Sequence, residues 1–267
     1  MSDTGMTRIS TAFTRARASG RATFMPYYIA GYPDLETSVA VFKALAEAGA
    51  DLIEVGVPFS DPLADGPTNQ MAAQMAIEQG TTVRDVLDVV ARLRDEGIGI
   101  PLVLMGYYNP FLAYGIENLC ADAAAAGADG FIVPDLPPDV RDGEAMRARC
   151  REHGLAFIPL LAPTSTEARI RAVARAATGF IYLVSVTGIT GEQERLPADL
   201  AAFVARVRRH TDLPLAVGFG ISRPEQAAQV ARIADGVVVG SALVKLGRDP
   251  DAVEQIRTFV SRFATIM

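Results

Sequence analysis

The chain has 267 residues, 50% of them hydrophobic and 21% charged, with a formal net charge of -6. This composition favours a globular protein with a large core, and the acidic balance argues against nucleic-acid binding, which needs a basic face. The sequence contains no run near the ~20 apolar residues of a membrane span and no apolar leader of a secretory signal. Cys120 and Cys150 fit neither a disulfide framework nor zinc spacing. We therefore expect a cytoplasmic protein that interacts with neither membrane nor nucleic acid.

Short apolar runs alternate with helical patterns along the chain. Residues 7–21 predict an amphipathic N-terminal helix, although their arginines and lack of acids also faintly suggest a transit peptide. Strands are predicted at Met25–Ala30, Leu52–Val57, Leu102–Gly106, Gly130–Val133, Ala156–Leu161, Ile181–Ser185, Leu215–Gly218 and Gly236–Val239. The helical patterns that follow them span about 35–48, 82–96, 116–126, 139–153, 166–177, 198–210, 224–233 and 251–264.

Eight such units predict an α/β fold, namely a single (β/α)8 TIM barrel with an extra N-terminal helix. We expect this barrel to form one domain over residues 1–267. A doubly wound open sheet is the alternative, but eight near-equal units fit a closed barrel better.

The scarcity of histidine and lysine restricts the chemistry. His153 and His210 lie near helix ends, so no His-rich metal site is expected, and we predict no metal in the site. A Schiff-base aldolase needs a lysine on a barrel strand, whereas Lys43 lies in a predicted helix and Lys245 follows the last strand. Carboxylates, tyrosines and backbone dipoles remain as catalysts.

Two acids are candidates for proton transfer. Alternation in the second strand places Leu52, Glu54 and Gly56 on one face, and the β-branched residues opposite them suit the helix-facing side. Glu54 should then point into the barrel mouth, where burial raises the pKa of a carboxyl group. A structural glutamate paired with a buried arginine is the alternative. The proline-rich loop Pro58–Gln70 carries Asp65, which could face the same cavity or belong to an acidic surface turn.

Glycines after the last two strands predict a phosphate site. Gly218, Gly220 and Gly240 allow main-chain N–H groups to approach an anion, and Ser241 should begin a short helix whose N-terminus favours negative charge. Many barrels bind phosphate at this position. The loop Val186–Pro197 is predicted to be a mobile lid over the same site.

Several aromatic residues follow or belong to these strands. Most of them are expected to be core residues, but together they would give the mouth an apolar lining suited to a flat ring. They are Tyr27, Tyr28, Tyr107, Tyr108, Tyr182 and Phe219.

Together these segments resemble the tryptophan synthase alpha chain family. The most specific segment is "PFSDPLADGP" after "EVGVP", and "VTGITG", "VGFGIS" and "GSALVK" follow in the expected order, so the resemblance runs from about Arg8 to the end of the chain. It implies cleavage of indole-3-glycerol phosphate to indole and glyceraldehyde 3-phosphate, with no cofactor in this chain. It also implies that Glu54 and Asp65 are the catalytic pair. The implied substrate-binding residues are Tyr27, Tyr182, Thr190, Gly191, Gly218, Phe219, Gly220, Gly240 and Ser241.

The resemblance further implies a partner, the pyridoxal-phosphate-containing beta chain, in an alpha2beta2 heterotetramer. The segments Pro58–Pro67, Gly106–Phe111 and Val133–Pro138 would form the interface, since they are apolar and proline-rich and lie at the catalytic end of the barrel. Three alternatives remain open at this point: a sugar-phosphate isomerase or epimerase, a non-catalytic activating subunit, and a lyase that releases indole without a partner.

Overall fold

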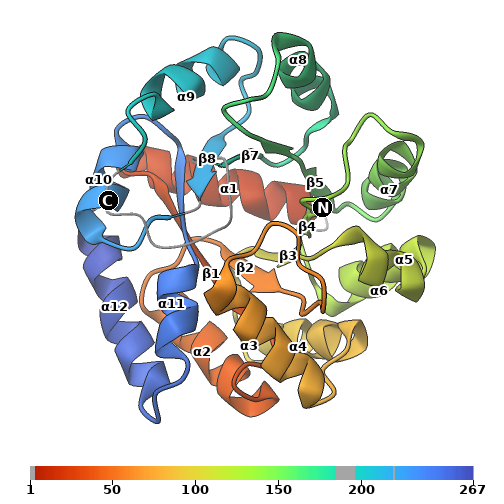
Figure 1. Cartoon of the computed structure of the whole chain (residues 1–267), viewed down its shortest axis with the longest axis vertical. Helices are drawn as coiled ribbons and strands as arrows, with labels where there is room; N and C mark the ends of the chain where they lie inside the picture. The colour runs from red at the N-terminus through yellow and green to blue at the C-terminus, as the bar shows by residue number, and fades with distance from the viewer. Residues whose placement is uncertain (1–3, 185–195, 219, 267) are drawn as a thin grey trace.

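The computed structural model describes residues 4–184, 196–218 and 220–266, which form a parallel barrel wrapped in helices (Figure 1). The strands are β1 (Thr23–Ile29), β2 (Ile53–Gly56), β3 (Leu102–Met105), β4 (Gly130–Ile132), β5 (Ala156–Ile158), β6 (Leu160–Leu161), β7 (Ile181–Val184), β8 (Leu215–Gly218) and β9 (Gly236–Val239). The helices are α1 (Gly5–Ala18), α2 (Leu35–Glu47), α3 (Pro67–Glu78), α4 (Val83–Asp95), α5 (Tyr108–Tyr114), α6 (Ile116–Ala126), α7 (Arg141–Glu152), α8 (Glu167–Ala176), α9 (Leu200–Arg208), α10 (Pro224–Ala231), α11 (Ser241–Leu246) and α12 (Ala252–Ile266).

The predicted barrel, its eight strand segments and its N-terminal helix are confirmed. One segment, predicted as a single strand over Ala156–Leu161, consists of the two short strands β5 and β6 on either side of Pro159. β5 pairs with β4, and β6 pairs with β7. β5 and β6 are therefore the first and last strands of the sheet, and because they follow each other directly in the chain the barrel closes between them. Proline has no N–H for the ladder, which suits the point where the strand changes partner.

Side chains alternate between the inside of the barrel and the helical layer. Leu52 packs inside with Val103 of β3, whereas Ile53 and Val55 belong to the cluster between the strands and the helices. Bulky residues on the outer face therefore join the sheet to the helices, as the alternation predicts.

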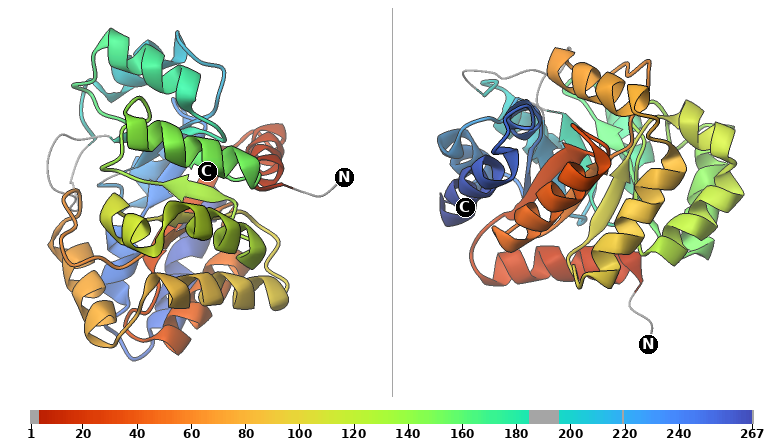
Figure 2. Two further views of the ribbon diagram at one scale, coloured as in Figure 1. Left: turned by 90° about the vertical axis from the view of Figure 1, so that its right-hand side faces the viewer. Right: turned by 90° about the horizontal axis from the view of Figure 1, so that it is seen from below.

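Helix α1 covers the end of the barrel where the strands begin (Figure 2). Its Ile9 and Phe13 are buried in the cluster that fills the barrel interior. The helix thus closes the core at the end where the strands begin.

Three aspartates form a polar floor at this end, each one or two residues before a strand begins. Asp51, Asp129 and Asp235 accept hydrogen bonds from main-chain N–H groups of β1, β3 and β8. Each also pairs with arginine: Asp51 with Arg21, Asp129 with Arg8 and Arg94, and Asp235 with Arg17 and Arg208. The floor therefore ties α1 and the residues after it to three separate strands.

None of the helices in the described ranges is long and apolar enough to cross a membrane.

The most buried of these aspartates should contribute most to stability. Asp129 has a fully buried side chain, and its oxygens lie 2.5 Å from Arg8 Nε and 2.6 Å from an Arg94 guanidinium nitrogen. Removing one partner of a buried ion pair leaves the others uncompensated, so we expect Asp129→Ala to lower the free energy of unfolding by ~3–5 kcal/mol. Urea denaturation measures this loss.

Glu47→Ala provides the control, because Glu47 pairs with Arg257 on the surface. An exposed pair contributes ~0–1 kcal/mol, so equal losses in the two variants would contradict the structural role of the floor.

Candidate active site

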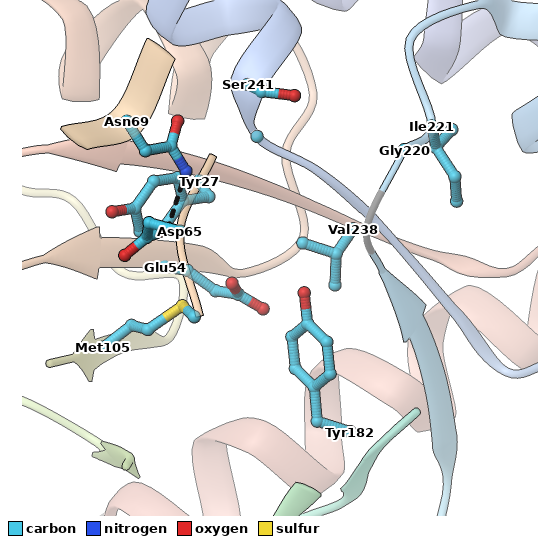
Figure 3. A pocket seen from close by; sticks show the side chains of 11 residues that line it. Tyr27, Glu54, Asp65, Asn69, Met105, Tyr182, Gly220, Ile221, Val238 and Ser241 are labelled. Carbon is cyan, nitrogen blue, oxygen red and sulfur yellow. Dashed lines mark hydrogen bonds between the residues drawn. The ribbon is translucent and has the colours of Figure 1, made fainter. Parts of the chain in front are cut away.

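A pocket opens at the carboxyl ends of the strands and encloses about 400 Å³ of empty space, part of it open to solvent. Figure 3 shows Glu54 and Asp65 on one side of it and Gly220 and Ser241 on the other. The lining residues are Tyr27, Glu54, Asp65, Asn69, Met105, Tyr182, Gly220, Ile221, Val238, Gly240 and Ser241. Seven of the residues predicted for the site are thus brought together in one cavity.

Glu54 reaches this cavity because of its place in β2. Its neighbour on the same face, Leu52, packs inside the barrel, and Glu54 lies level with Tyr27 of β1 and Val103 of β3. The predicted inward direction of Glu54 is therefore confirmed. Its side chain is fully buried, and within the described ranges neither carboxyl oxygen has a hydrogen-bond partner. The alternative of a glutamate paired with an arginine is not what the structure shows.

Burial raises the pKa of Glu54 well above its ordinary value. The cause is loss of solvation, which disfavours the charged form. A carboxyl group held in this way gives up and takes back a proton more readily near neutral pH than an exposed one.

Asp65 is also buried, but its carboxylate has two donors. Asn69 Nδ2 donates to Asp65 Oδ1 at 3.0 Å, and the Tyr107 hydroxyl donates to Oδ2 at 2.8 Å. Burial raises the pKa of Asp65, and these two hydrogen bonds oppose the rise. Among the described residues the two acids therefore have different environments: Glu54 has no hydrogen-bond partner, and Asp65 has two donors.

The tyrosines of the pocket lie against glycines. A methyl group at Gly218 would lie 2.0 Å from the Tyr182 hydroxyl oxygen, and one at Gly56 would lie 2.6 Å from the Tyr27 hydroxyl oxygen. A side chain at either position would therefore force the tyrosine ring or the main chain to shift. Gly218, which was predicted to bind substrate, does not line the pocket itself. It packs closely against Tyr182, which does.

The other side of the pocket presents main chain. Gly220 has a φ of +85°, which an L side chain adopts only with strain, and Ser241 begins α11, as predicted. The first N–H groups of any helix have no partner within it, so this side offers donors to an anion. The predicted residues Thr190, Gly191 and Phe219 lie outside the described residues.

Asn69, Met105, Ile221 and Val238 line the pocket but were not predicted. Residues 58–70 were expected to be loop throughout, whereas α3 begins at Pro67 and carries Asn69 inward. Proline after glycine was a usable signal, since proline favours the first position of a helix. Met105 lies level with Gly56 in the sheet register, which single-sequence analysis does not provide.

The described residues contain no group of three or more His, Cys, Asp or Glu side chains placed to hold a metal ion.

The raised pKa of Glu54 links the stability of the fold to pH. The unfolded glutamate ionises near pH ~4.3, whereas the folded one stays protonated to higher pH, so folding binds a proton and stability falls as the pH rises between the two pKa values. We expect Glu54→Gln to be more stable than the parent chain at pH 8.5, with a smaller gain at pH 5. Urea denaturation at both values measures the difference.

Glu144→Gln, the same change on the exposed side of α7, gives the background effect. A Glu54→Gln gain that is equal at both pH values would show that the buried carboxyl group is not protonated on folding.

Known proteins resemble this chain over nearly its full length. A sequence model of the tryptophan synthase alpha chain matches residues 13–265. The tryptophan synthase alpha chain of Geobacter sulfurreducens is 49% identical over 96% of this chain and 97% of its own length, and that of Opitutus terrae is 52% identical over 91% of each.

Solved structures agree in fold. A Mycobacterium tuberculosis tryptophan synthase structure superimposes with a TM-score of 0.90 at 41% identity, over 97% of both chains. The tryptophan synthase subunit alpha of Legionella pneumophila gives a TM-score of 0.89 at 35% identity, again over 97% of both chains. The chain therefore belongs to the tryptophan synthase alpha chain family, whose members catalyse the alpha reaction of tryptophan biosynthesis.

Proposed function

We propose that Glu54 and Asp65 are the catalytic acids of the alpha reaction in this chain, the retro-aldol cleavage of indole-3-glycerol phosphate. The observation that carries the proposal is the Glu54 carboxyl group, which is fully buried, faces the pocket and has no partner in the described part of the chain. A buried ionisable group without a partner destabilises the fold, and groups of this kind cluster at functional sites.

The two environments suit two different tasks. The C3–side-chain bond of the substrate breaks only after the indole ring is protonated at C3. Glu54, whose pKa is raised by burial, transfers protons at C3 and at the side-chain hydroxyl. The oxygens of Asp65 accept hydrogen bonds from Asn69 and Tyr107. The Asp65 carboxylate also accepts a hydrogen bond from the indole N–H and stabilises the positive charge that develops on the ring.

The remaining predicted residues surround the substrate. Tyr27 and Tyr182 flank the ring, and the main chain at Gly220, Gly240 and Ser241 holds the phosphate. All five residues line the same pocket as the two acids. Thr190, Gly191, Gly218 and Phe219 are proposed to complete this site.

Membership of the family implies a beta-chain partner, and we propose an alpha2beta2 heterotetramer. Four large apolar side chains are exposed among the described residues, and Leu35 is exposed by 37% at the start of α2. The other three are Leu63, exposed by 83%, Leu112 by 52% and Val140 by 43%. Leu63, Leu112 and Val140 lie in or within two residues of the three segments predicted for the interface, whereas Leu35 lies outside them. Exposed apolar side chains of this size favour burial against another protein.

We propose that this chain needs no organic cofactor and that pyridoxal phosphate belongs to the beta chain. That cofactor is held by a lysine Schiff base. Neither Lys43 nor Lys245 lines the pocket, and Lys43 instead pairs with Glu96 at 2.6 Å on the surface.

We place the chain in the cytoplasm, because Cys120 and Cys150 are buried free thiols. Such cysteines are typical of a reducing compartment.

Conservative changes at the two acids should separate chemistry from binding. We expect Glu54→Gln to abolish indole release while the chain still binds a non-cleavable indole phosphate, because glutamine keeps the shape but transfers no proton. Asp65→Asn should lower kcat by ~10²–10⁴-fold. Indole release from indole-3-glycerol phosphate by the isolated chain measures both effects.

Asp61→Asn is the matched control, since Asp61 lies in the same loop, is exposed and contacts Ser60. Full activity of Glu54→Gln would refute the assigned role, and equal losses in Asp61→Asn and Asp65→Asn would refute the specific role of Asp65.

The proposed interface is testable at its most exposed apolar residue. We expect Leu63→Asp to weaken association with the beta chain by about ten-fold or more, because a carboxylate would be buried in an apolar contact. Analytical ultracentrifugation of the mixed chains measures the affinity. Thr14→Asp, exposed on α1 at the far end of the barrel, should leave it unchanged, and an unchanged affinity in Leu63→Asp would exclude this face.

A further inference from the structure

Asn69 occupies an unexpected position for an amide. The buried stripe of α3 consists of Asn69, Ala72, Ala73 and Ala76, with the spacing of one helix face. Three of these residues are alanine and pack as ordinary core, while the first is polar, 6% exposed and part of the pocket wall. A buried amide is normally hydrogen-bonded at both ends, so its partners decide what it does.

Only one end of this amide has a partner in the described part of the chain. Nδ2 donates to Asp65 Oδ1 at 3.0 Å, whereas Oδ1 accepts no hydrogen bond from any described residue. The orientation follows from chemistry, because an ionised carboxylate only accepts hydrogen bonds. The nitrogen must therefore face Asp65 and the carbonyl oxygen must point elsewhere. Figure 3 shows the Asn69–Asp65 hydrogen bond at the wall of the pocket.

Tyr107 supplies a second hydrogen-bond donor to Asp65, and a main-chain N–H group fixes the direction of its hydroxyl proton. Its hydroxyl oxygen accepts a hydrogen bond from the Ala64 main-chain N–H at 3.0 Å, and its own proton is donated to Asp65 Oδ2 at 2.8 Å. Each carboxylate oxygen of Asp65 thus has one fixed donor. Two donors on different oxygens set the plane of the carboxylate as well as its distance from the ring-binding space.

We propose that Asn69 is a positioning and specificity residue: its amide nitrogen orients the Asp65 carboxylate together with Tyr107, and its carbonyl oxygen accepts a hydrogen bond from the N–H edge of a bound ring. The inference rests on the proposed function, which places the indole ring beside Asp65. The Asn69 carbonyl oxygen and the Asp65 carboxylate then both face the same edge of the ring as hydrogen-bond acceptors. This pair favours a ring with an N–H at that edge and disfavours a ring with only a lone pair at that position.

The orienting role is tested by following the titration of Asp65 itself. The chain is labelled with carbon-13 aspartate, and the NMR signal of Asp65 is identified by its loss in Asp65→Asn. We expect the titration midpoint of Asp65 to lie at higher pH in Asn69→Leu than in the parent chain. Leucine keeps the volume of asparagine but removes a hydrogen-bond donor to the ionised carboxylate. Tyr107→Phe should shift the midpoint in the same direction through the other oxygen, which keeps the test available if Asn69→Leu does not fold.

Gln70→Leu is the matched control. The neighbouring Gln70 also donates to Asp65, but to its main-chain oxygen at 2.8 Å, so the carboxylate keeps both donors. We expect the Asp65 midpoint of this variant to equal that of the parent chain. A parental midpoint in both Asn69→Leu and Tyr107→Phe would overturn the orienting role.

The acceptor role is tested with two ligands that are not cleaved, indole-3-propanol phosphate and its benzofuran counterpart, in which a ring oxygen replaces the N–H. We expect the parent chain to bind the indole ligand more tightly and Asn69→Leu to lower this preference by about ten-fold, as when one buried hydrogen bond is lost. Calorimetric titration measures both affinities, and an unchanged preference in Asn69→Leu would overturn the acceptor role.

Neither measurement depends on turnover. If Glu54→Gln and Asp65→Asn retained the alpha reaction, the proposed function would fail while the Asp65 titration still reported whether Asn69 orients that carboxylate.

Discussion

The carboxyl group of Glu54 lies inside the barrel because the pleat of β2 gives it no other direction. Ile53 and Val55 belong to the layer between the strands and the helices, and a shift of one residue would place both of them inside and the acid among apolar helices. The outward packing of β-branched side chains therefore determines where the acid points. Removal from water then raises its pKa, so a reactive property of the pocket follows from the packing of the opposite face of the strand.

A pocket that buries a carboxyl group lowers the stability of the fold. The paired aspartates at the opposite end of the barrel offset this loss. At the mouth, the Glu54 carboxyl group has no partner among the residues that the structure describes, and it lies beside tyrosines that pack closely against glycines. At the floor, Asp51, Asp129 and Asp235 each satisfy a strand N–H and an arginine. Barrels commonly separate a reactive end from a stabilising end, and here the two ends use carboxyl groups in opposite ways.

Much of the fold could be predicted from the sequence, because continuous apolar runs and their alternation report on both layers of a barrel. The same alternation indicated the direction of Glu54. Helix α3 was missed because its inner face carries small alanines and one asparagine, a weak apolar signal, between prolines and acids typical of a loop. Asn69 and Met105 could not be placed in the site, since that needs the helix and the strand register. The division of labour between Glu54 and Asp65 came from the family resemblance, not from any pattern of residues.

The ion pairs of α1 bear on the order in which the molecule is assembled. Arg8 contacts a residue 121 positions later in the chain, and Arg17 contacts one 218 positions later. A ribosome therefore releases the first helix long before Asp235 has been synthesised, and the helix cannot complete its contacts until the final strand has emerged. Because contacts so distant in sequence form late and slow folding, a helix that is synthesised before the barrel strands is among the last to be secured in its native place.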